Sequence, residues 1–209
     1  MCYDGCMFID CNQLTPSQIY FLLIQTVIPR PIAWVLSESY NGAYNLAPFS
    51  FFNVVGSHPP IVMLSIGWKD EKERKDTWVN IKERKDFVVH IPSVEHIKEV
   101  VASSAALPHG TSEINSDITS LEKLEGQRLP RIKSAKVAMF CEKFAIHEIG
   151  SDPQALILGQ VNHIWFSDDI VERKNDRIMV HQENLNPLSR LGGNDYASLG
   201  KILSIPRPD

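Results

Sequence analysis

The chain has 209 residues, of which 44% are hydrophobic and 22% are charged, and its formal net charge is −4. This balance is typical of a globular protein whose core forms one domain. Weak acidity argues against a nucleic-acid partner, since binding to a phosphate backbone needs a clustered basic face. The apolar run at residues 19–24 is far shorter than the roughly 20 residues that span a bilayer, so we expect no membrane partner.

The cysteines and the start of the chain indicate a cytoplasmic protein without a metal site. The first residues include acidic side chains and lack the basic region of a signal peptide. Four cysteines are too few for a disulfide framework in a chain of this size, and their C-x3-C-x4-C spacing at the start does not match a zinc site. We predict reduced thiols of unassigned role at Cys2, Cys6, Cys11 and Cys141.

The first predicted element is a helix over residues 14–27. Thr15 is expected to be the N-cap, Pro16 the first helical residue and Gln18 the partner that completes a capping box. The helix should end before Pro29, because proline cannot continue it.

A strand is predicted next, over residues 30–39, because the segment is rich in branched and aromatic residues. The pair Asn41 and Gly42 predicts a two-residue hairpin turn in which both residues have positive φ. The return strand is expected to begin at Ala43. Further strands are predicted over residues 60–67, 86–92, 135–150 and 154–167.

Helices are predicted between these strands. Residues 76–85 form a helix with Asp76 as N-cap candidate and basic residues at its end, which suits the helix dipole. Residues 93–107 form a second, with Ser93 as N-cap, and residues 116–126 a weaker third.

About six strands, with hairpins at both ends and helices inserted between them, predict a mainly β protein: an antiparallel barrel closed on itself. Regular βαβ alternation and a GxGxxG sequence are both missing, so a Rossmann domain is not expected. No linker interrupts the chain, which predicts a single domain over residues 1–209. The Gly- and Pro-rich tail, from about residue 186 to 209, is expected on the surface or against a neighbouring subunit.

Residues 45–53 read NLAPFSFFN and mix aromatic with short polar side chains. One interpretation is a wall and polar edge for a flat ligand such as a flavin ring, with amides near Pro48 left unpaired by the strand. The other interpretation is a distorted edge strand whose phenylalanines are core residues. Composition alone leaves both open.

Two further segments have a ligand-binding and a simpler interpretation. Residues 72–80, KERKDTWVN, place basic residues and a hydroxyl group at the start of a helix, a position where phosphate binds readily. The simpler interpretation is an exposed run of charged residues before an ordinary helix. In residues 186–200, Gly192 and Gly193 permit close approach of the backbone to a ligand and Arg190 can pair with an anion; the alternative is a surface tail.

Together these segments resemble the flavin reductase-like family, the FMN-binding split-barrel proteins that include flavoredoxin and the small reductase partners of two-component monooxygenases. The resemblance rests on segments in matching order from about residue 15 to 200: IPRPIAWVLS, NGAYNLAPFSFFNVVGSHPPIVMLSIG, RKDTWVNI, DFVVHI, LPHGTSEI, ALILGQVNHIWF and PLSRLGGNDYASLG. It implies an antiparallel split β-barrel with inserted helices, a homodimer, and FMN held near the dimer interface.

The resemblance also implies which residues hold FMN. Along the flavin it places Asn45, Ala47, Ser50, Phe51, Phe52 and Asn53. At the phosphate it places Arg74, Lys75 and Thr77, and from the tail it brings Arg190, Gly193 and Tyr196. LPHGTSEI departs from the family, which more often has an acidic or aromatic residue after the glycine-bearing turn, so the resemblance leaves the substrate side open but not the FMN site.

We therefore expect an FMN-dependent oxidoreductase with NADH or NADPH as electron donor. Electrons would leave bound FMN for free flavin, an iron complex or a partner protein. Since the flavin carries the chemistry, no catalytic side chain is predicted. The alternatives are a non-catalytic FMN-binding carrier or sensor, and a barrel without a cofactor.

Overall fold

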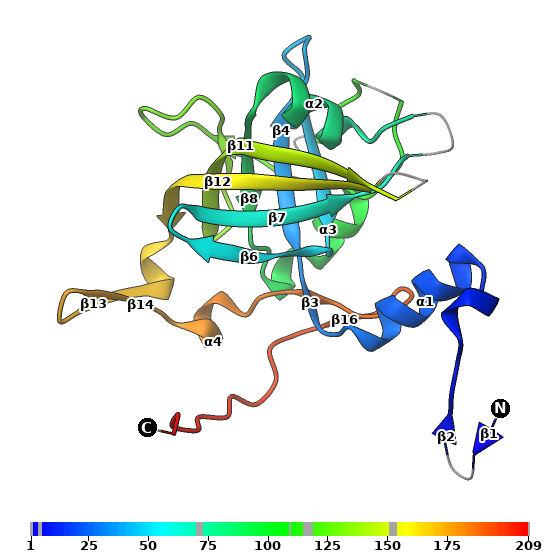
Figure 1. Ribbon diagram of the computed structural model, residues 1–209. Helices are drawn as coiled ribbons and strands as arrows, with labels where there is room; N and C mark the ends of the chain where they lie inside the picture. Colours follow the sequence, from blue (N-terminus) through cyan, green and yellow to red (C-terminus); the bar gives the residue numbers. More distant parts are fainter. Residues whose placement is uncertain are drawn as a thin grey trace.

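The computed structural model describes residues 2–3, 6–69, 73–108, 110–114, 119–150 and 154–208. Its largest sheet has seven antiparallel strands in the order β5-β4-β8-β11-β12-β7-β6, so the mainly β, antiparallel fold class is confirmed (Figure 1). The strands are β4 Ala33–Glu38, β5 Tyr44–Phe49, β6 Phe52–Ser57, β7 Pro60–Ile66, β8 Asp86–His90, β11 Val137–Ile149 and β12 Gln154–Phe166.

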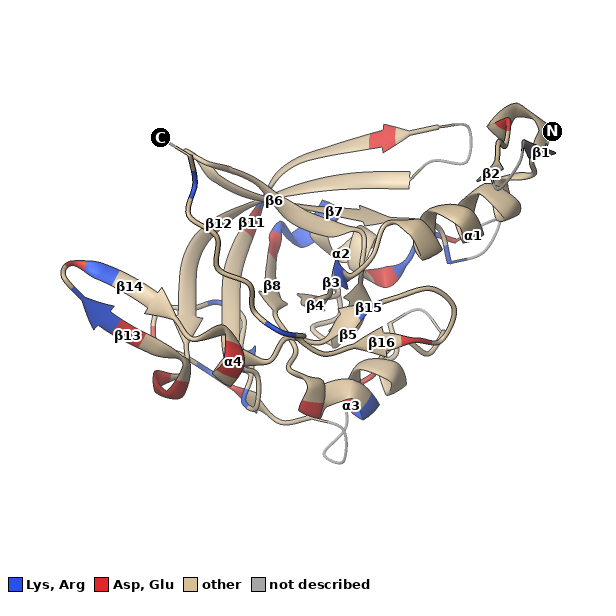
Figure 2. Ribbon diagram, turned by 90° about the horizontal axis from the view of Figure 1, so that it is seen from below, with Lys and Arg blue, Asp and Glu red and all other residues tan. Residues whose placement is uncertain are grey.

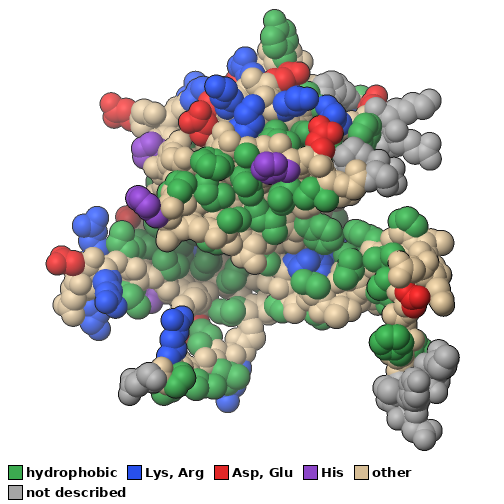
Figure 3. Space-filling model, viewed as in Figure 1, with side chains coloured by type: hydrophobic (Ala, Val, Ile, Leu, Met, Phe, Trp, Pro, Cys, Tyr) green, Lys and Arg blue, Asp and Glu red, His purple; other side chains and the backbone are tan. Residues whose placement is uncertain are grey.

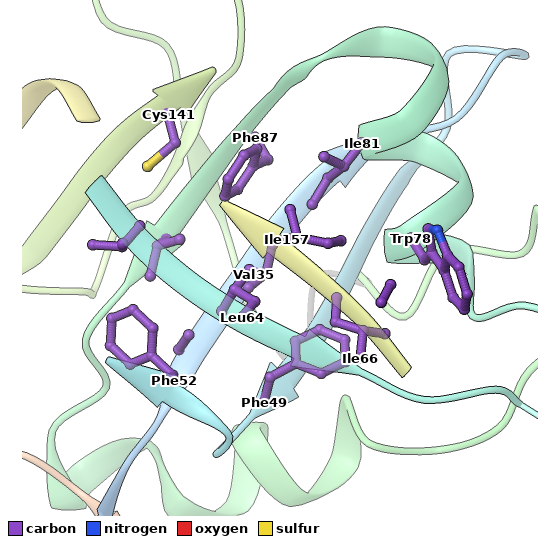
Figure 4. Close-up of a cluster of buried hydrophobic side chains, with 14 of the residues drawn as sticks. Val35, Phe49, Phe52, Leu64, Ile66, Trp78, Ile81, Phe87, Cys141 and Ile157 are labelled. Carbon is purple, nitrogen blue, oxygen red and sulfur yellow. The ribbon is translucent and has the colours of Figure 1, made fainter. Parts of the chain in front are cut away.

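The sheet curls round one apolar core, which we call the inner core (Figure 2). Every one of the seven strands contributes a side chain to it, and helix α2, Asp76–Arg84, closes one end with two more (Figure 4). Its buried members are Ala33, Val35, Phe49, Phe52, Val62, Leu64, Ile66, Trp78, Ile81, Phe87, Val89, Cys141, Ala155, Ile157 and Val161.

The barrel has one open seam, between its two edge strands β5 and β6. In the described part of the chain these strands share no ladder, and only Ser50 and Phe51 lie between them in the sequence. The segment 45–53 therefore runs from one edge of the sheet to the other. The single return strand that was predicted to begin at Ala43 is instead two strands, β5 and β6. This is the split barrel that the resemblance implied.

A second apolar cluster, the outer core, packs on the opposite faces of β4, β5, β8 and β11. Along β4, Val35 points into the barrel, whereas Trp34 and Leu36 point into the outer core. Strands buried on both faces read as continuous apolar runs, as residues 32–36 do. The members are Ile32, Trp34, Leu36, Leu46, Val88, Val100, Leu129, Ile132, Ala135, Ala138, Phe140 and Leu188.

Helix α1, Pro16–Thr26, begins with the predicted capping box. The Thr15 amide donates to Gln18 Oε1 at 2.9 Å, and the Gln18 amide donates to Thr15 Oγ1 at 3.3 Å. The helix lies outside the barrel, and Ile24 is its one buried residue (Figure 1). No helix in the described residues is long and apolar enough to cross a membrane.

The predicted two-residue turn at Asn41 and Gly42 is wrong. The Ser39 amide donates to the Ala43 carbonyl at 2.9 Å, so three residues form the loop, and Gly42 has a φ of 83° while Asn41 stays outside the positive region. Asn41 Oδ1 accepts the Ala43 N–H at 3.0 Å. This hydrogen bond stabilises a three-residue turn in which only the last residue, Gly42, needs a positive φ.

Two predicted helices also need correction. Residues 93–107 form a short 3₁₀ turn, Val94–His96, followed by α3, Ile97–Ala102, which ends five residues early. Within residues 119–126 the chain forms no helix; β9 Leu121–Glu122 pairs with β10 Arg131–Ile132 instead. The tertiary reason is that this pair covers the outer core, where Leu121 packs.

The remaining elements lie at the periphery. A small sheet joins β3 Arg30–Pro31, β15 Ser189–Arg190 and β16 Tyr196–Ala197 below the barrel (Figure 1). A hairpin of β13 Val171–Lys174 and β14 Arg177–Val180 follows η3 Asp168–Ile170 and precedes α4 Gln182–Leu185. The N-terminal part contains β1 Cys2–Tyr3, β2 Cys6–Met7 and η1 Cys11–Gln13. Residues 198–208 have no regular structure and extend away from the barrel (Figure 1).

Candidate functional site

A cavity of about 240 Å³ lies beside β5, at the start of α2. Three parts of the chain that are far apart in the sequence form its walls: edge strand β5, the approach to α2 with its first turn, and the loops that follow α3. The lining residues are Asn45, Ala47, Pro48, Phe49, Lys69, Lys75, Asp76, Thr77, Ser103, Ser104, Ala105, Ala106, Leu107 and Glu113.

The β5 wall has groups that an edge strand leaves free. The Leu46 N–H points away from β4 and donates to Glu113 Oε2 at 3.0 Å. Pro48 lies two residues further on and faces the same side, so its missing N–H breaks no ladder bond. Asn45 is buried, and its Nδ2 donates to Thr77 Oγ1 at 2.9 Å, which ties the strand to α2.

The α2 wall is the N-terminus of a nine-residue helix. Lys75 is its N-cap, not Asp76 as predicted, and Asp76 lies in the first turn. Asp76 Oδ1 instead accepts the N–H of Gly110 at 3.1 Å, because the loop carrying Gly110 packs against the helix start. The unpaired N–H groups of a first turn carry partial positive charge, so this wall suits an anion.

Charged groups of both signs line the cavity. The Lys75 ammonium lies 5.7 Å from the centre of the Phe49 ring, and desolvation by the protein atoms around it lowers its pKa. Lys69 Nζ donates to the Leu107 carbonyl at 2.5 Å. Burial raises the pKa of Glu113, although the Leu46 amide acts in the opposite direction. The cavity therefore offers cations to an anion and a carboxylate acceptor to hydroxyl groups.

A second group of predicted site residues gathers just beyond the cavity, round Arg30. Arg30 Nε donates to Ser50 Oγ at 3.3 Å, and the guanidinium lies 6.0 Å from the centre of the Phe51 ring. Arg190 is the partner of Arg30 in the β3–β15 ladder and lies 4.5 Å from the Tyr196 ring. We call Arg30, Ser50, Phe51, Arg190 and Tyr196 the Arg30 cluster. Gly193 adjoins it, because its carbonyl accepts a hydrogen bond from Arg190.

The structure thus brings the predicted residues together in two sets. Asn45, Ala47, Lys75 and Thr77 line the cavity, and Ser50, Phe51, Arg190, Gly193 and Tyr196 belong to or adjoin the Arg30 cluster.

Three predicted residues lie outside both sets. Phe52 is buried in the inner core, as the alternative interpretation of the segment expected. Asn53 is exposed on β6, and its Oδ1 accepts the N–H of Val54 at 2.8 Å. Arg74 donates to Glu148 at 3.1 Å and lies 4.7 Å from the Trp78 ring. Their part in binding stays a prediction.

Sequence reasoning missed the third wall of the cavity. Residues 103–107 were predicted to be helical, but the Ser103 hydroxyl donates to the Val100 carbonyl at 3.1 Å and accepts the Trp34 Nε1–H at 2.8 Å. No local pattern indicates that long-range contact. For Glu113 a signal existed, since an acidic residue stands in the quoted segment LPHGTSEI. Lys69 had none beyond its closeness to the predicted phosphate segment.

The sequence matches the family model described as flavin reductase like domain over residues 25–188. It is 37% identical to an uncharacterized protein of Bacillus subtilis, over 95% of this chain and 98% of that one. Nitrilotriacetate monooxygenase component B from Bacillus cereus is 32% identical with a TM-score of 0.88, covering 96% of this chain and 99% of that one. The 2-nitrobenzoate 2-nitroreductase of Pseudomonas fluorescens is 28% identical with a TM-score of 0.85, covering 97% and 96%. The chain belongs to the flavin reductase-like domain family.

Proposed function

We propose that the protein binds FMN and works as an NADH- or NADPH-dependent reductase in the cytoplasm. Electrons would pass from bound FMN to free flavin, an iron complex or a partner protein. The observation that carries the proposal is the cavity between the N-terminus of α2 and the edge of β5, whose lining residue Phe49 directly precedes Ser50 of the Arg30 cluster. Membership of the family supports it.

The α2 end of the cavity fits a phosphate group. Lys69 and Lys75 supply positive charge, of which Asp76, 3.9 Å from Lys69, balances a part, and Thr77 lies in the first turn of the helix. A hydrogen bond to a charged group contributes about 1.5–3 kcal/mol, so a few of them distinguish FMN from riboflavin.

The carboxylate of Glu113 favours a neutral group over a second anionic group in the part of the ligand that lies next to the phosphate. Asn45 and Glu113 are both buried beside the cavity. The ribityl chain of FMN carries neutral hydroxyl groups, which donate hydrogen bonds to carboxylate and amide oxygens. A ligand with a phosphate at one end and hydroxyl groups next to it therefore matches the charges of this site.

The cavity is too small for a whole flavin nucleotide. At about 240 Å³ it lies below the roughly 300–1,000 Å³ of sites that enclose a drug-sized ligand. We infer that the ring lies outside it, along residues 48–51, with the apolar rings of Phe51 and Tyr196 and the polar groups of the Arg30 cluster nearby. When bound, FMN supplies the hydride-accepting ring, while these residues orient it.

The exposed apolar surface supports a homodimer that completes this open site. Val54 and Val55 on edge strand β6 are 69% and 58% exposed, and α1 exposes Tyr20, Phe21 and Leu23. Figure 3 shows hydrophobic side chains gathered across the middle of this face, over the barrel strands and α1. Large apolar patches on a surface mark interaction sites. We propose that a second copy covers this face.

Light scattering at micromolar concentration with FMN present tests the dimer. The expected mass is twice the 23.6 kDa of one chain. A monomer mass under these conditions would contradict the proposed assembly.

An absorbance spectrum tests the reductase. The protein is loaded with FMN, freed of excess ligand, and recorded before and after anaerobic addition of NADH or NADPH. Rapid bleaching of the flavin is expected. A yellow protein that neither nucleotide bleaches would indicate a carrier or sensor, and a protein that stays colourless after loading would overturn FMN binding.

A further inference from the structure

Arg30 holds three segments of the chain together at the seam of the barrel. It is 6% exposed, and its Nη1 donates to the carbonyls of Ile24 and Val27, at 2.5 and 2.9 Å, at the end of α1. Its Nη2 donates to the Leu191 carbonyl at 2.8 Å, in the C-terminal segment. Its Nε donates to Ser50 Oγ at 3.3 Å. The planar guanidinium thus fixes the place of Ser50 relative to α1 and the C-terminal segment.

The charge of Arg30 is compensated by dipoles and not by an ion pair. In the described parts of the chain no carboxylate lies within 4.0 Å of its guanidinium, and its ladder partner is another cation, Arg190. The carbonyls at the end of α1 carry partial negative charge and account for two of its hydrogen bonds. The bond from Nε to Ser50 serves no helix end, so it needs another explanation.

That bond has a consequence for the Ser50 hydroxyl. Because Ser50 Oγ accepts from Arg30, its own hydrogen remains available to donate elsewhere. Ser50 directly follows Pro48 and Phe49, which line the cavity, and it lies at the gap between β5 and β6. A hydrogen-bond donor of fixed position therefore lies where the proposed site leaves the flavin ring outside the cavity.

We propose that Arg30 is a positioning residue, which holds the Ser50 hydroxyl as a hydrogen-bond donor to the polar edge of the bound flavin ring. This inference rests on the proposed FMN site. The reduced ring has more electron density on its polar atoms, so a fixed donor stabilises the reduced form more than the oxidised form. Arg30 thereby raises the reduction potential of the bound flavin without touching it.

Reduction potentials of bound FMN test the proposal, measured in the wild type, Arg30→Lys, Ser50→Ala and the double variant. Lysine keeps the charge but lacks the planar fork that reaches all four acceptors. We expect either single change to weaken binding of reduced relative to oxidised FMN about tenfold, which corresponds to about 30 mV for a two-electron couple. The double variant should match Ser50→Ala, because Arg30 acts through Ser50. Additive shifts, or no shift in Arg30→Lys, would overturn the proposal.

Arg131→Lys is the control, a buried arginine that bonds carbonyls as Arg30 does and in addition pairs with Glu122. Arg131 is 4% exposed, and its Nη1 donates to the carbonyls of Ile132, Lys133 and Ala135, but it lies at the outer core, beside Trp165. Its variant should lose stability and keep the potential of bound FMN. An equal potential shift in Arg131→Lys would assign the effect to general loosening and overturn the role of Arg30.

A measurement on the wild type covers the case in which Arg30→Lys does not fold. With ¹⁵N-labelled arginine, the Arg30 Nε–H resonance is identified by its change in Ser50→Ala. It should shift when FMN binds and again when the flavin is reduced, and a resonance that responds to neither step overturns the inference. Failure of the wild type to bind FMN would overturn the proposed function as well, whereas normal binding with a potential insensitive to Arg30 overturns this inference alone.

Discussion

The inner and outer cores lie back to back on β4 and β8, yet they are built differently. The inner core consists of apolar side chains and Cys141, whose pKa burial raises to about 12. The outer core is bordered by buried polar groups, including His90, Ser103 and Arg131. The first is apolar throughout and has buried hydrogen bonds only where α2 joins the strands, from Asn45 to Thr77 and from Asn80 to Ser37, among the described residues. The second depends on directed hydrogen bonds along its border.

This difference matters because one wall of the cavity directly continues the outer core. The bond from Trp34 Nε1 to Ser103 Oγ ties β4 to the end of α3, and the next residues, 104–107, line the cavity. The inner core borders the cavity through Ala47 and Phe49 on β5 and through the first turn of α2. We therefore expect damage to the inner core to lower stability, and damage to the outer core to lower both stability and ligand affinity.

Lowering the pH should destabilise the outer core before the inner core. His90 Nδ1 donates to the Trp34 carbonyl at 3.0 Å and its Nε2 accepts the Ile132 N–H at 3.0 Å, so the ring is neutral. Burial lowers the pKa of His90 to about 3, against about 6.5 when unfolded. The unfolded state binds the proton between these values, so stability is full above pH 6.5 and falls by about 1.4 kcal/mol per unit below it.

Denaturant titrations from pH 7 to pH 4 measure this slope. His90→Gln should be less stable at pH 7 and lose that part of the slope. The exposed His163→Gln is the control and should keep the wild-type slope. An equal slope in His90→Gln and the wild type would contradict the assignment.

Gly159→Ala should damage the inner core alone. A Cβ at this position of β12 would lie 2.3 Å from Cζ of Phe87, which is 1% exposed. Overpacking of this kind costs about 1–3 kcal/mol. The free energy of unfolding should fall by that amount, with FMN affinity within about twofold of the wild type. Gly200→Ala, where nothing lies within 4 Å, should change neither quantity.

Ser103→Ala should damage the outer core and the cavity together. The change removes the hydroxyl that accepts the Trp34 Nε1–H, and a buried donor without a partner costs about 1–3 kcal/mol. Because the cavity wall starts at Ser103, FMN affinity should fall at least about threefold, measured by fluorescence titration. Gly159→Ala serves as the control of similar stability. A Ser103→Ala protein that binds FMN as tightly as Gly159→Ala would contradict the expected difference between the two cores in their effect on ligand affinity.

Lys75→Ala should affect binding far more than stability, although the Lys75 ammonium lies 5.7 Å from the ring of Phe49 in the inner core. Loss of one charge-assisted bond to phosphate weakens FMN about tenfold and leaves riboflavin within about twofold. Lys82→Ala removes the same charge from an exposed position of the same helix, away from the cavity, and should change neither affinity. Equal losses for both ligands in Lys75→Ala would remove Lys75 from the phosphate site.

Part of the candidate site was predictable because its residues lie near one another in the sequence. Lys75 and Thr77 stand at a recognisable helix start, and Asn45 and Ala47 lie on one strand with Pro48. Lys69, Ser103 and Glu113 reach the same cavity only through contacts between distant segments. Arg30 was part of a quoted strand, and nothing in its neighbours indicates that Ser50, twenty residues on, accepts its hydrogen bond.

By itself the sequence determined the elements whose bonds close within a few residues. The capping box of α1 joins Thr15 to Gln18, and the long strands β11 and β12 follow from their apolar residues. Only the tertiary structure decided that Leu121–Glu122 pair as a strand, that α3 ends at Ala102, and that segment 45–53 crosses the seam of the barrel. The physical reason is that each of these depends on a partner far away in the chain, such as Trp34 for Ser103, and local propensity carries no information about that partner.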